Sequence, residues 1–355
     1  MINAIIFLVR IGLGSAIAGI TVISVIAFFG FANPLFDAFN HFQLILFLGS
    51  LTFLFLSTLV FINSPWRTKI LVVGASGFLL SAIVVIPEQL RGILYKPSAQ
   101  SSQPVIKLMS HNMFGLNYDM ERMANIIGEQ NPDIIALQEY FPKQQQDLHP
   151  RIIAEYPYFL RCAGRKRSFI ALYSKTEFSV EKGTLCASDP NRFDNPAARI
   201  IASLKDANGN EYTMVVTHLN WPIQINPLFN EELGPIEKLD AMSARKRGEW
   251  EELTDEINKI EGPIVVAGDF NSTGWSFAMN KFTKDTGLIR HSQGLLTYPM
   301  LLYLDGWRET IPFLSIDHIL ASEEIFMQNI GTGEQTGSDH LPLYARFSVI
   351  PKISE

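Results

Sequence analysis

Three apolar stretches near the amino terminus constrain the fold of this 355-residue chain more than any other feature. They run without a charged side chain over residues 11–32, 42–62 and 70–86. At a rise of about 1.5 Å per residue, stretches of this length cross most or all of a hydrocarbon core about 30 Å thick. Helices of a soluble core rarely stay uncharged for so long, and here it happens three times. The sequence therefore predicts three transmembrane helices.

The charge distribution divides the chain into two chemically different parts. Only seven of the 64 Lys, Arg, Asp and Glu residues lie within residues 1–96, and the net charge of −6 for the whole chain becomes −9 for residues 97–355. This acidic balance does not indicate a basic cradle for nucleic acid. We predict a membrane anchor over residues 1–91, a polar linker over 92–104 and a catalytic domain over 105–355.

The positions of Lys and Arg predict the orientation of the anchor. Arg10 flanks the first stretch and Arg67 and Lys69 separate the second from the third, whereas residues 33–41 contain neither Lys nor Arg. Because Lys and Arg favour the cytoplasmic side, we expect a cytoplasmic amino terminus. Three crossings then place the catalytic domain outside the cytoplasm, on the inner (cell) membrane of a bacterium. Two basic residues after the third stretch weigh against this orientation.

Only two cysteines occur, Cys162 and Cys186, so the spacing of a structural zinc site is absent. In an oxidising compartment the two can form one disulfide. The sequence leaves a disulfide and two free thiols equally open.

After residue 104, short apolar runs alternate with helical patterns. Helices are expected at 119–130 and 238–260, and Asn208-Gly209 between two apolar runs predicts a hairpin. Strands are expected at residues 105–110, 133–138, 169–173, 199–204, 212–217, 264–267, 315–319 and 343–349. Strands joined both by hairpins and by helices predict a mixed α/β sandwich.

Polar clusters follow five of these strands, where side chains leave the sheet and can converge. They are Ser110-His111-Asn112, Leu137-Gln138-Glu139, Thr217-His218-Leu219, Gly268-Asp269-Phe270-Asn271 and Ser338-Asp339-His340. Asp317-His318 lies on the predicted strand that precedes the last of these clusters. Carboxylates, imidazoles and carboxamides suit a hard cation held by oxygen ligands beside acid–base histidines. Each cluster alone also has an ordinary structural explanation, such as a turn or a helix cap. Glu139 is harder to explain that way, because a carboxylate ending a buried strand has little structural use unless it binds something.

The order of the clusters resembles the endonuclease/exonuclease/phosphatase superfamily, the DNase I-like group. The resemblance rests on Asn after a first strand, LQE after a second, THL in the middle, GDFN after a fourth, and ID followed by SDH, and it covers about residues 105–350. It implies a four-layered α/β sandwich, here preceded by three transmembrane helices. It also implies a metal-dependent phosphoric ester hydrolase.

The resemblance implies a site for Mg²⁺ (or Mn²⁺). Glu139 matches the principal metal ligand of the family, with Asn112 and Asp339 beside it. This small set is sufficient in physical terms, because Mg²⁺ keeps several waters and takes only one or two protein carboxylates.

The resemblance also implies a catalytic role for five residues. Asp269 and Asn271 match the pair that orients the attacking water and the phosphate, with Asp269 the favoured base. His218 matches the histidine used for leaving-group protonation or for stabilising the transition state. His340 matches the histidine that contacts the phosphate, and Asp317 matches the carboxylate that orients it.

One departure from the family bears on the substrate. Asp194, in Phe193-Asp194-Asn195-Pro196-Ala197, occupies a place where DNase-like nucleases often have Arg, and it would repel a nucleic-acid phosphate. We therefore favour a phosphodiester in or near the bilayer, such as a lipid head group. The alternatives are an extracytoplasmic nuclease for DNA or RNA and a non-catalytic sensor or assembly protein on the same fold. Apolar residues at 221–229 and 295–307 are expected in loops or short helices at the rim, facing the lipid bilayer or packed in the core.

Overall fold

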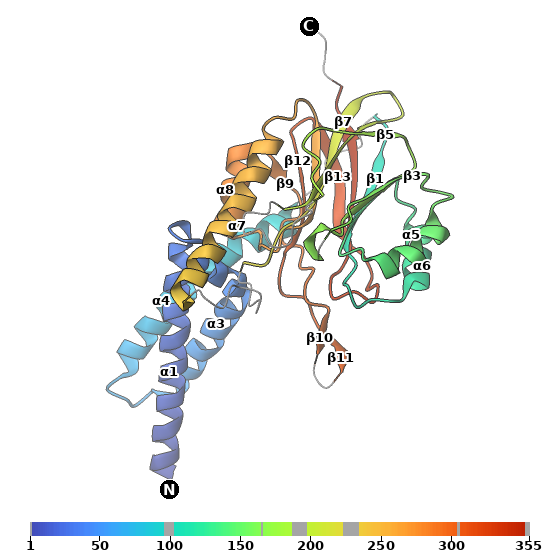
Figure 1. Ribbon diagram of the computed structural model, residues 1–355. Helices are drawn as coiled ribbons and strands as arrows, with labels where there is room; N and C mark the ends of the chain where they lie inside the picture. The colour runs from blue at the N-terminus through green and yellow to red at the C-terminus, as the bar shows by residue number, and fades with distance from the viewer. Residues whose placement is uncertain are drawn as a thin grey trace.

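The computed structural model describes residues 2–95, 103–164, 166–186, 197–222, 234–303 and 306–351. Figure 1 shows long amino-terminal helices on one side of two packed β-sheets. The predicted architecture, a mixed α/β sandwich preceded by three long apolar helices, is confirmed.

The segment predicted to be the anchor consists of α1 (Ile2–Phe28), α3 (Gln43–Val60) and α4 (Arg67–Leu94), which pack on one another. Between α1 and α3 lie η1 (Phe29–Phe31), α2 (Pro34–Asp37) and η2 (Ala38–Phe42). Three segments are long and apolar enough to cross a membrane, at Asn3–Phe31, Pro34–Val60 and Arg67–Leu94. The last of these continues eight residues beyond the apolar stretch that the sequence analysis marks.

Small residues let α1 and α4 approach closely. A side chain at Gly77 would come within 2.6 Å of the Thr21 hydroxyl, and the hydroxyls of Ser24 and Ser81 lie 3.2 Å apart. Small residues and interhelical hydroxyl contacts are typical of helix packing in lipid, where no water remains to drive association.

The first sheet has the strand order β13-β14-β1-β2-β4-β3. Its strands are β1 (Ile106–Asn112), β2 (Ile134–Gln138), β3 (Tyr158–Arg161), β4 (Ala171–Ser174), β13 (Ile325–Thr332) and β14 (Leu343–Val349). The central pair β1 and β2 is parallel, and the other pairs are antiparallel.

The second sheet has the order β5-β6-β7-β8-β12-β9. Its strands are β5 (Phe178–Val180), β6 (Arg199–Lys205), β7 (Glu211–His218), β8 (Ile264–Asp269), β9 (Ile289–Arg290) and β12 (Asp317–Ala321). Here β7 and β8 are the parallel pair. A separate hairpin joins β10 (Leu301–Tyr303) to β11 (Trp307–Glu309).

The two sheets pack face to face, and helices cover their outer faces. Alternate residues of β1 show the layers, since Leu108 belongs to the core between the sheets and Met109 to the core beneath α5 (Met120–Gln130) and α6 (Pro142–Ile152). The helices α7 (Pro235–Ile257) and α8 (Phe277–Thr286) cover the second sheet. Because both faces of each sheet are buried, the central strands are almost continuously apolar.

The expected strands all form, with small shifts of their ends. The strand predicted at 315–319 begins two residues later, at Asp317, and extends to Ala321. Its ladder with β8 begins at the pair of Asp317 with Asp269. The Asn208-Gly209 turn joins β6 and β7 as predicted, with Gly209 at a φ of 83°. The sequence analysis misses α6, α8 and the strands β3, β5, β9, β10, β11 and β13.

Cys162 and Cys186 form a disulfide between the segment after β3 and the segment after β5. The structure thereby decides between the two states that the sequence leaves open. The bond ties the edge of the first sheet to the edge of the second.

Candidate active site

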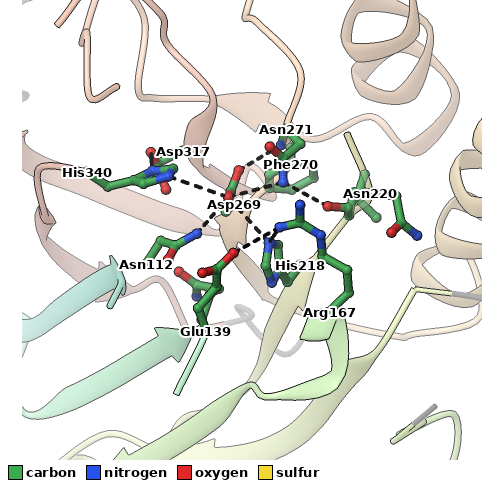
Figure 2. A network of polar contacts seen from close by, with 12 residues as sticks. Asn112, Glu139, Arg167, His218, Asn220, Asp269, Phe270, Asn271, Asp317 and His340 are labelled. Carbon is green, nitrogen blue, oxygen red and sulfur yellow. Dashed lines mark hydrogen bonds and ion pairs between the residues drawn. The ribbon is translucent and has the colours of Figure 1, made fainter. Parts of the chain in front are cut away.

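The strand register brings the polar clusters to one edge of the sandwich. Asn112 pairs with Gln138 at the end of the parallel strands β1 and β2, and His218 pairs with Asp269 at the end of β7 and β8. Because the carboxyl ends of parallel strands lie at the same edge of a sheet, the polar clusters that follow the two strands of each pair lie side by side. Figure 2 shows these side chains pointing toward one another from both sheets.

Asp269 lies at the centre of the site. Its Oδ2 accepts hydrogen bonds from the side-chain amides of Asn112 (2.9 Å) and Asn271 (3.2 Å), and its Oδ1 accepts one from the Asn271 backbone (2.8 Å). Burial opposes its charge, but contacts with His218 and the nearby His340 hold the pKa of Asp269 well below its usual range. Asp269 is therefore ionised at neutral pH.

The position before Asp269 requires glycine, because the backbone of β7 lies very close to Gly268. A Cβ at this position would collide with the carbonyl oxygen of Thr217. Glycine thus permits the tight β7–β8 contact that sets His218 beside Asp269, with His218 Nε2 at 3.4 Å from Asp269 Oδ2.

Asp317 and His340 form a buried ion pair. Asp317 Oδ2 lies 2.8 Å from His340 Nδ1 and accepts a second hydrogen bond from the Thr297 hydroxyl at 2.6 Å. Burial opposes a charge on His340, but the Asp317 carboxylate raises the pKa of His340 to about 10. The ring is an imidazolium at neutral pH, and its Nε2 faces Asp269 Oδ2 at 3.9 Å.

Glu139 follows β2 in a left-handed conformation, with a φ of 52°. One carboxylate oxygen accepts from the backbone of Gly115, and the other pairs with Arg167 at 3.1 Å. Arg167 also contacts Nε2 of His218, and burial together with this cation lowers the pKa of His218. His218 is therefore a neutral imidazole, unlike His340.

The sequence analysis does not select Arg167. It lies in a short 3₁₀ turn (Lys166–Ser168) of a polar, basic segment that follows no apolar strand of the predicted pattern. The run of basic residues at 165–167 is the feature that would have pointed to it.

Lys246 is a second residue that the sequence analysis does not select. Its buried ammonium group donates to the carbonyl oxygens of Asn220 and Phe270, the residues that follow β7 and β8. Burial lowers the pKa of Lys246 to about 8. It lies in the middle of α7, where a helical pattern of charges looks like an ordinary solvated face.

The carboxylates of this site fit a divalent cation. Among the described residues, Oδ1 of Asp317 and Oδ1 of Asp339 are buried without a hydrogen-bond partner. Burial, together with the nearby carboxylates of Glu139 and Asp269, raises the pKa of Asp339 to about 6 although the imidazolium of His340 opposes this shift. A bound cation would offset the negative charge of these carboxylates.

The structure groups the candidate ligands differently from the sequence. Asp269, Asp317 and His340 offer one ligand atom each within 4.8 Å of one another. Of the predicted ligands, Asn112 donates from its side-chain nitrogen to Asp269, and its side-chain oxygen accepts from the backbone amide of Phe114.

The rim residues are only partly described. Asp194 and residues 223–229 lie outside the described part of the chain. Trp221 contacts the ring of Tyr298 with centroids 5.6 Å apart, and Tyr298 packs on His340 at 4.8 Å. In the predicted rim segment at 295–307, residues 295–300 form a loop as expected, whereas residues 301–303 and Trp307 belong to the strands of the β10–β11 hairpin.

Comparison with solved structures finds the same fold. The endonuclease/exonuclease/phosphatase of Beutenbergia cavernae has a TM-score of 0.52 and 14% identity, covering 71% of this chain and 74% of its own. The endonuclease/exonuclease/phosphatase of Bacteroides vulgatus and the mannosyl-6-phosphatase Bt3783 of Bacteroides thetaiotaomicron each have a TM-score of 0.49. Their identities are 18% and 16%, over 69% and 68% of this chain and 99% of their own.

A search of curated proteins gives no match to this chain. The model of the Endonuclease/Exonuclease/phosphatase family matches residues 109–340, well over half of the chain and every polar cluster described above. This chain belongs to the endonuclease/exonuclease/phosphatase family.

Proposed function

We propose that this protein is a membrane-anchored, divalent-metal-dependent phosphoesterase that hydrolyses a phosphodiester. The observation that carries the proposal is the convergence on Asp269 of two carboxamides, a neutral histidine and a protonated one. A purely structural cluster would not need an ionised aspartate, a charged imidazole and unpaired carboxylate oxygens in one buried place.

We propose Mg²⁺ or Mn²⁺ as the cofactor, with Glu139 as principal ligand and Asn112 and Asp339 beside it. The buried group of Asp269, Asp317 and His340 is the alternative set that the geometry offers. A bound cation would supply Lewis-acid stabilisation of the charge that develops on the phosphoryl oxygens.

The side chains of the chain itself align water and phosphate. Asp269 is ionised, and its low pKa makes it a better acceptor for orienting a water than for removing a proton completely. The Asn271 side chain is fixed by donating to the carbonyl oxygen of Leu219 at 2.9 Å. The imidazolium of His340 places positive charge where the transition state becomes more negative.

His218 remains our candidate for helping the leaving group. Its pKa is lowered, so it would first have to take up a proton before it could donate one. His340 already holds its proton at neutral pH. We therefore expect substitution of the two histidines to affect the rate differently on substrates that differ in their leaving group.

We propose that the domain lies outside the cytoplasm, held by an anchor over residues 1–91 and a linker over 92–104. Arg10, whose guanidinium donates to the carbonyl oxygen of Val60, lies at the end of the helices away from the sheets, as does Arg67 at the start of α4. Basic residues at that end support a cytoplasmic amino terminus. The disulfide supports an oxidising compartment for the domain.

The β10–β11 hairpin supports a lipid head group as substrate. In Figure 1 it extends from the sandwich toward the side on which α1 begins. Its apolar side chains are unusually exposed, with 69% of Tyr303, 44% of Trp307 and 84% of the following Ile311 accessible. Aromatic side chains of this kind favour the interface between bilayer and water.

One assay tests the proposal. The purified full-length protein in detergent, with Mg²⁺ or Mn²⁺, is offered an aryl phosphodiester, plasmid DNA, RNA and a panel of phospholipids and sphingolipids in parallel. Metal-dependent hydrolysis of the aryl ester and a lipid is the expected result. Cleavage of nucleic acid alone would favour the nuclease, and an inert protein would favour the sensor or assembly role.

A further inference from the structure

The loop between β8 and α8 is fastened to the membrane anchor. This loop, residues 270–276, follows Asp269 and contains Asn271. Trp275 Nε1 donates to the carbonyl oxygen of Asn40 at 2.6 Å, and His41 Nε2 lies 3.2 Å from the carbonyl oxygen of Asn271. Asn40 and His41 belong to the polar connection between α1 and α3, so the anchor touches the backbone of a proposed catalytic residue.

The same connection caps the helix that follows the loop. The two carboxylate oxygens of Asp37 accept from the backbone amides of Phe277 and Ala278, each at 2.9 Å. These are the first two amides of α8, which the helix itself cannot satisfy, and a negative charge at this end is favoured by the helix dipole. Ser276 of the loop supplies the usual cap by accepting from Met279. Asp37 therefore completes the capping of α8 from outside the domain.

The end of α4 is linked to the same loop through the side chain of Arg290. Glu88 pairs with both terminal nitrogens of Arg290 and accepts from the backbone of Gly294 at 3.0 Å. Arg290 in turn donates to the carbonyl oxygen of Gly274 at 3.1 Å. The four residues that make these contacts, Asp37, Asn40, His41 and Glu88, are all buried.

Buried polar groups are costly unless they are paired, so a simple tether would not carry them. In this loop Asn271 holds a φ of 46°, in the left-handed region that asparagine enters more readily than most residues other than glycine, and its carbonyl oxygen faces His41 of the connection. We infer that the connection between the first two membrane helices is part of the active-site scaffold, with Asp37 and His41 as positioning residues for Asn271 and Asp269. The inference rests on the proposed function for its catalytic consequence.

The chemistry of His41 provides a matched pair of variants. Its Nδ1 lies 3.0 Å from the carbonyl oxygen of Ala38, and its Nε2 faces Asn271. The amide nitrogen of glutamine takes the place of Nε2, and that of asparagine takes the place of Nδ1. His41→Gln therefore keeps a donor toward Asn271, and His41→Asn keeps one only toward Ala38.

The kinetic test uses full-length protein in phosphatidylcholine nanodiscs with saturating Mg²⁺ and bis-4-nitrophenyl phosphate as substrate. We expect His41→Asn to lower kcat about tenfold with KM nearly unchanged, as for a lost hydrogen bond that aligns the reacting groups. His41→Gln should restore kcat to within about twofold of the starting protein. Thr58→Val, on α3 away from the domain, is the control and should change neither constant.

A second measurement reports on the loop without any activity. Hydrogen exchange of the peptide covering residues 270–280 should be faster in Asp37→Asn, because the amides of Phe277 and Ala278 lose their charged acceptor, and faster in His41→Asn than in His41→Gln. Equal exchange in all variants, or equal kcat for the glutamine and asparagine variants, overturns the inference. A starting protein inert toward every phosphoester would instead refute the proposed function, and the exchange data would still decide the role of the anchor.

Discussion

Of the two histidines of the site, His340 is charged and His218 is neutral, because their neighbours differ. His340 has the Asp317 carboxylate at 2.8 Å, which raises the pKa of its ring, whereas His218 has burial and Arg167, which lower it. The sequence places both histidines at strand ends but contains nothing that distinguishes their charge. That difference comes from a carboxylate beside one ring and a guanidinium beside the other, each supplied by a residue far away in the chain.

Removing the charge of Glu139 should disable the site. We expect Glu139→Gln to lower kcat/KM by roughly a hundred- to a thousandfold and to weaken the apparent affinity for Mg²⁺, because the amide keeps the shape but not the charge of the ligand. Activity against metal concentration is the measurement. Glu129→Gln, an exposed glutamate on α5, is the control and should behave normally. A normal rate with unchanged metal dependence in Glu139→Gln would show that the metal is held elsewhere.

The two histidines can be separated by the leaving group of the substrate. If His218 protonates the leaving oxygen, His218→Ala should lower the rate on an alkyl phosphodiester about a hundredfold more than on an aryl one, whose leaving group needs no proton. His340→Gln should lower both rates about equally, because it removes a charge that faces the phosphate. Equal losses on both substrates in His218→Ala would remove the acid role from His218.

At the scale of elements, the same parallel pairing occurs once in each sheet and builds the site. The pairs β1–β2 and β7–β8 deliver their last residues to one edge, and β12 adds Asp317 opposite Asp269. The β10–β11 hairpin stands apart from this core. Its exposure makes it the element that can be altered with the least effect on the chemistry.

Substitutions in the hairpin should separate lipid from soluble substrates. We expect Tyr303→Ser with Trp307→Ser to lower turnover of a lipid in vesicles about tenfold while sparing a soluble aryl phosphodiester, because the exposed rings would no longer enter the interface. Trp221 is unsuitable for this test, since it packs on Tyr298 next to His340. A parallel loss on both substrates would mean that these rings support the fold, as the contact of Trp307 with Phe114 permits.

The strand β12 should also make the fold sensitive to acid. His318 is buried between Ser292 and the carbonyl oxygen of Ser272, and burial lowers its pKa to about 3. Below pH 6.5 the unfolded chain binds a proton that the native chain does not, so stability falls as the pH falls toward 3. From pH 7 to pH 5 this amounts to about 2 kcal/mol. Thermal unfolding at both pH values should show a smaller difference in His318→Gln than in the unaltered protein, and an equal difference would exclude His318 as the source.

For the whole molecule, the anchor and the sandwich form one contiguous structure. The connection between α1 and α3 contacts the loop at Asn271, and the end of α4 contacts Arg290, so both of these helix ends meet the domain on the same side. The proposed topology accordingly places an odd number of spans between the amino terminus and the domain. The orientation itself rests on the basic residues at the far end.

A reporter fused after residue 355 tests that orientation. We expect activity only from a reporter that works outside the cytoplasm, such as alkaline phosphatase, because three spans carry the domain across. In the same cells, Cys162 and Cys186 should resist thiol labelling until a reductant is added. A fusion that works only in the cytoplasm would reverse the proposed topology.

The sequence by itself determined the large features of this protein. Uncharged length fixes the membrane helices, alternation of apolar residues fixes the main strands, and the order of strand-end motifs fixes the family, because each depends on residues close together in the chain. All eight predicted site residues lie within these short strand-end motifs, which is why the sequence alone could select them.

Only the tertiary structure decided how those residues interact. Arg167 and Lys246 reach the site, and Asp37 and His41 reach its supporting loop and α8, from segments whose local pattern does not reveal these contacts. The disulfide, the charge of His340 and the support of Asn271 likewise depend on pairs separated by 24, 23 and 230 residues. Such contacts exist only once both sheets and the anchor have packed, because packing fixes the distances that pair charges and donors.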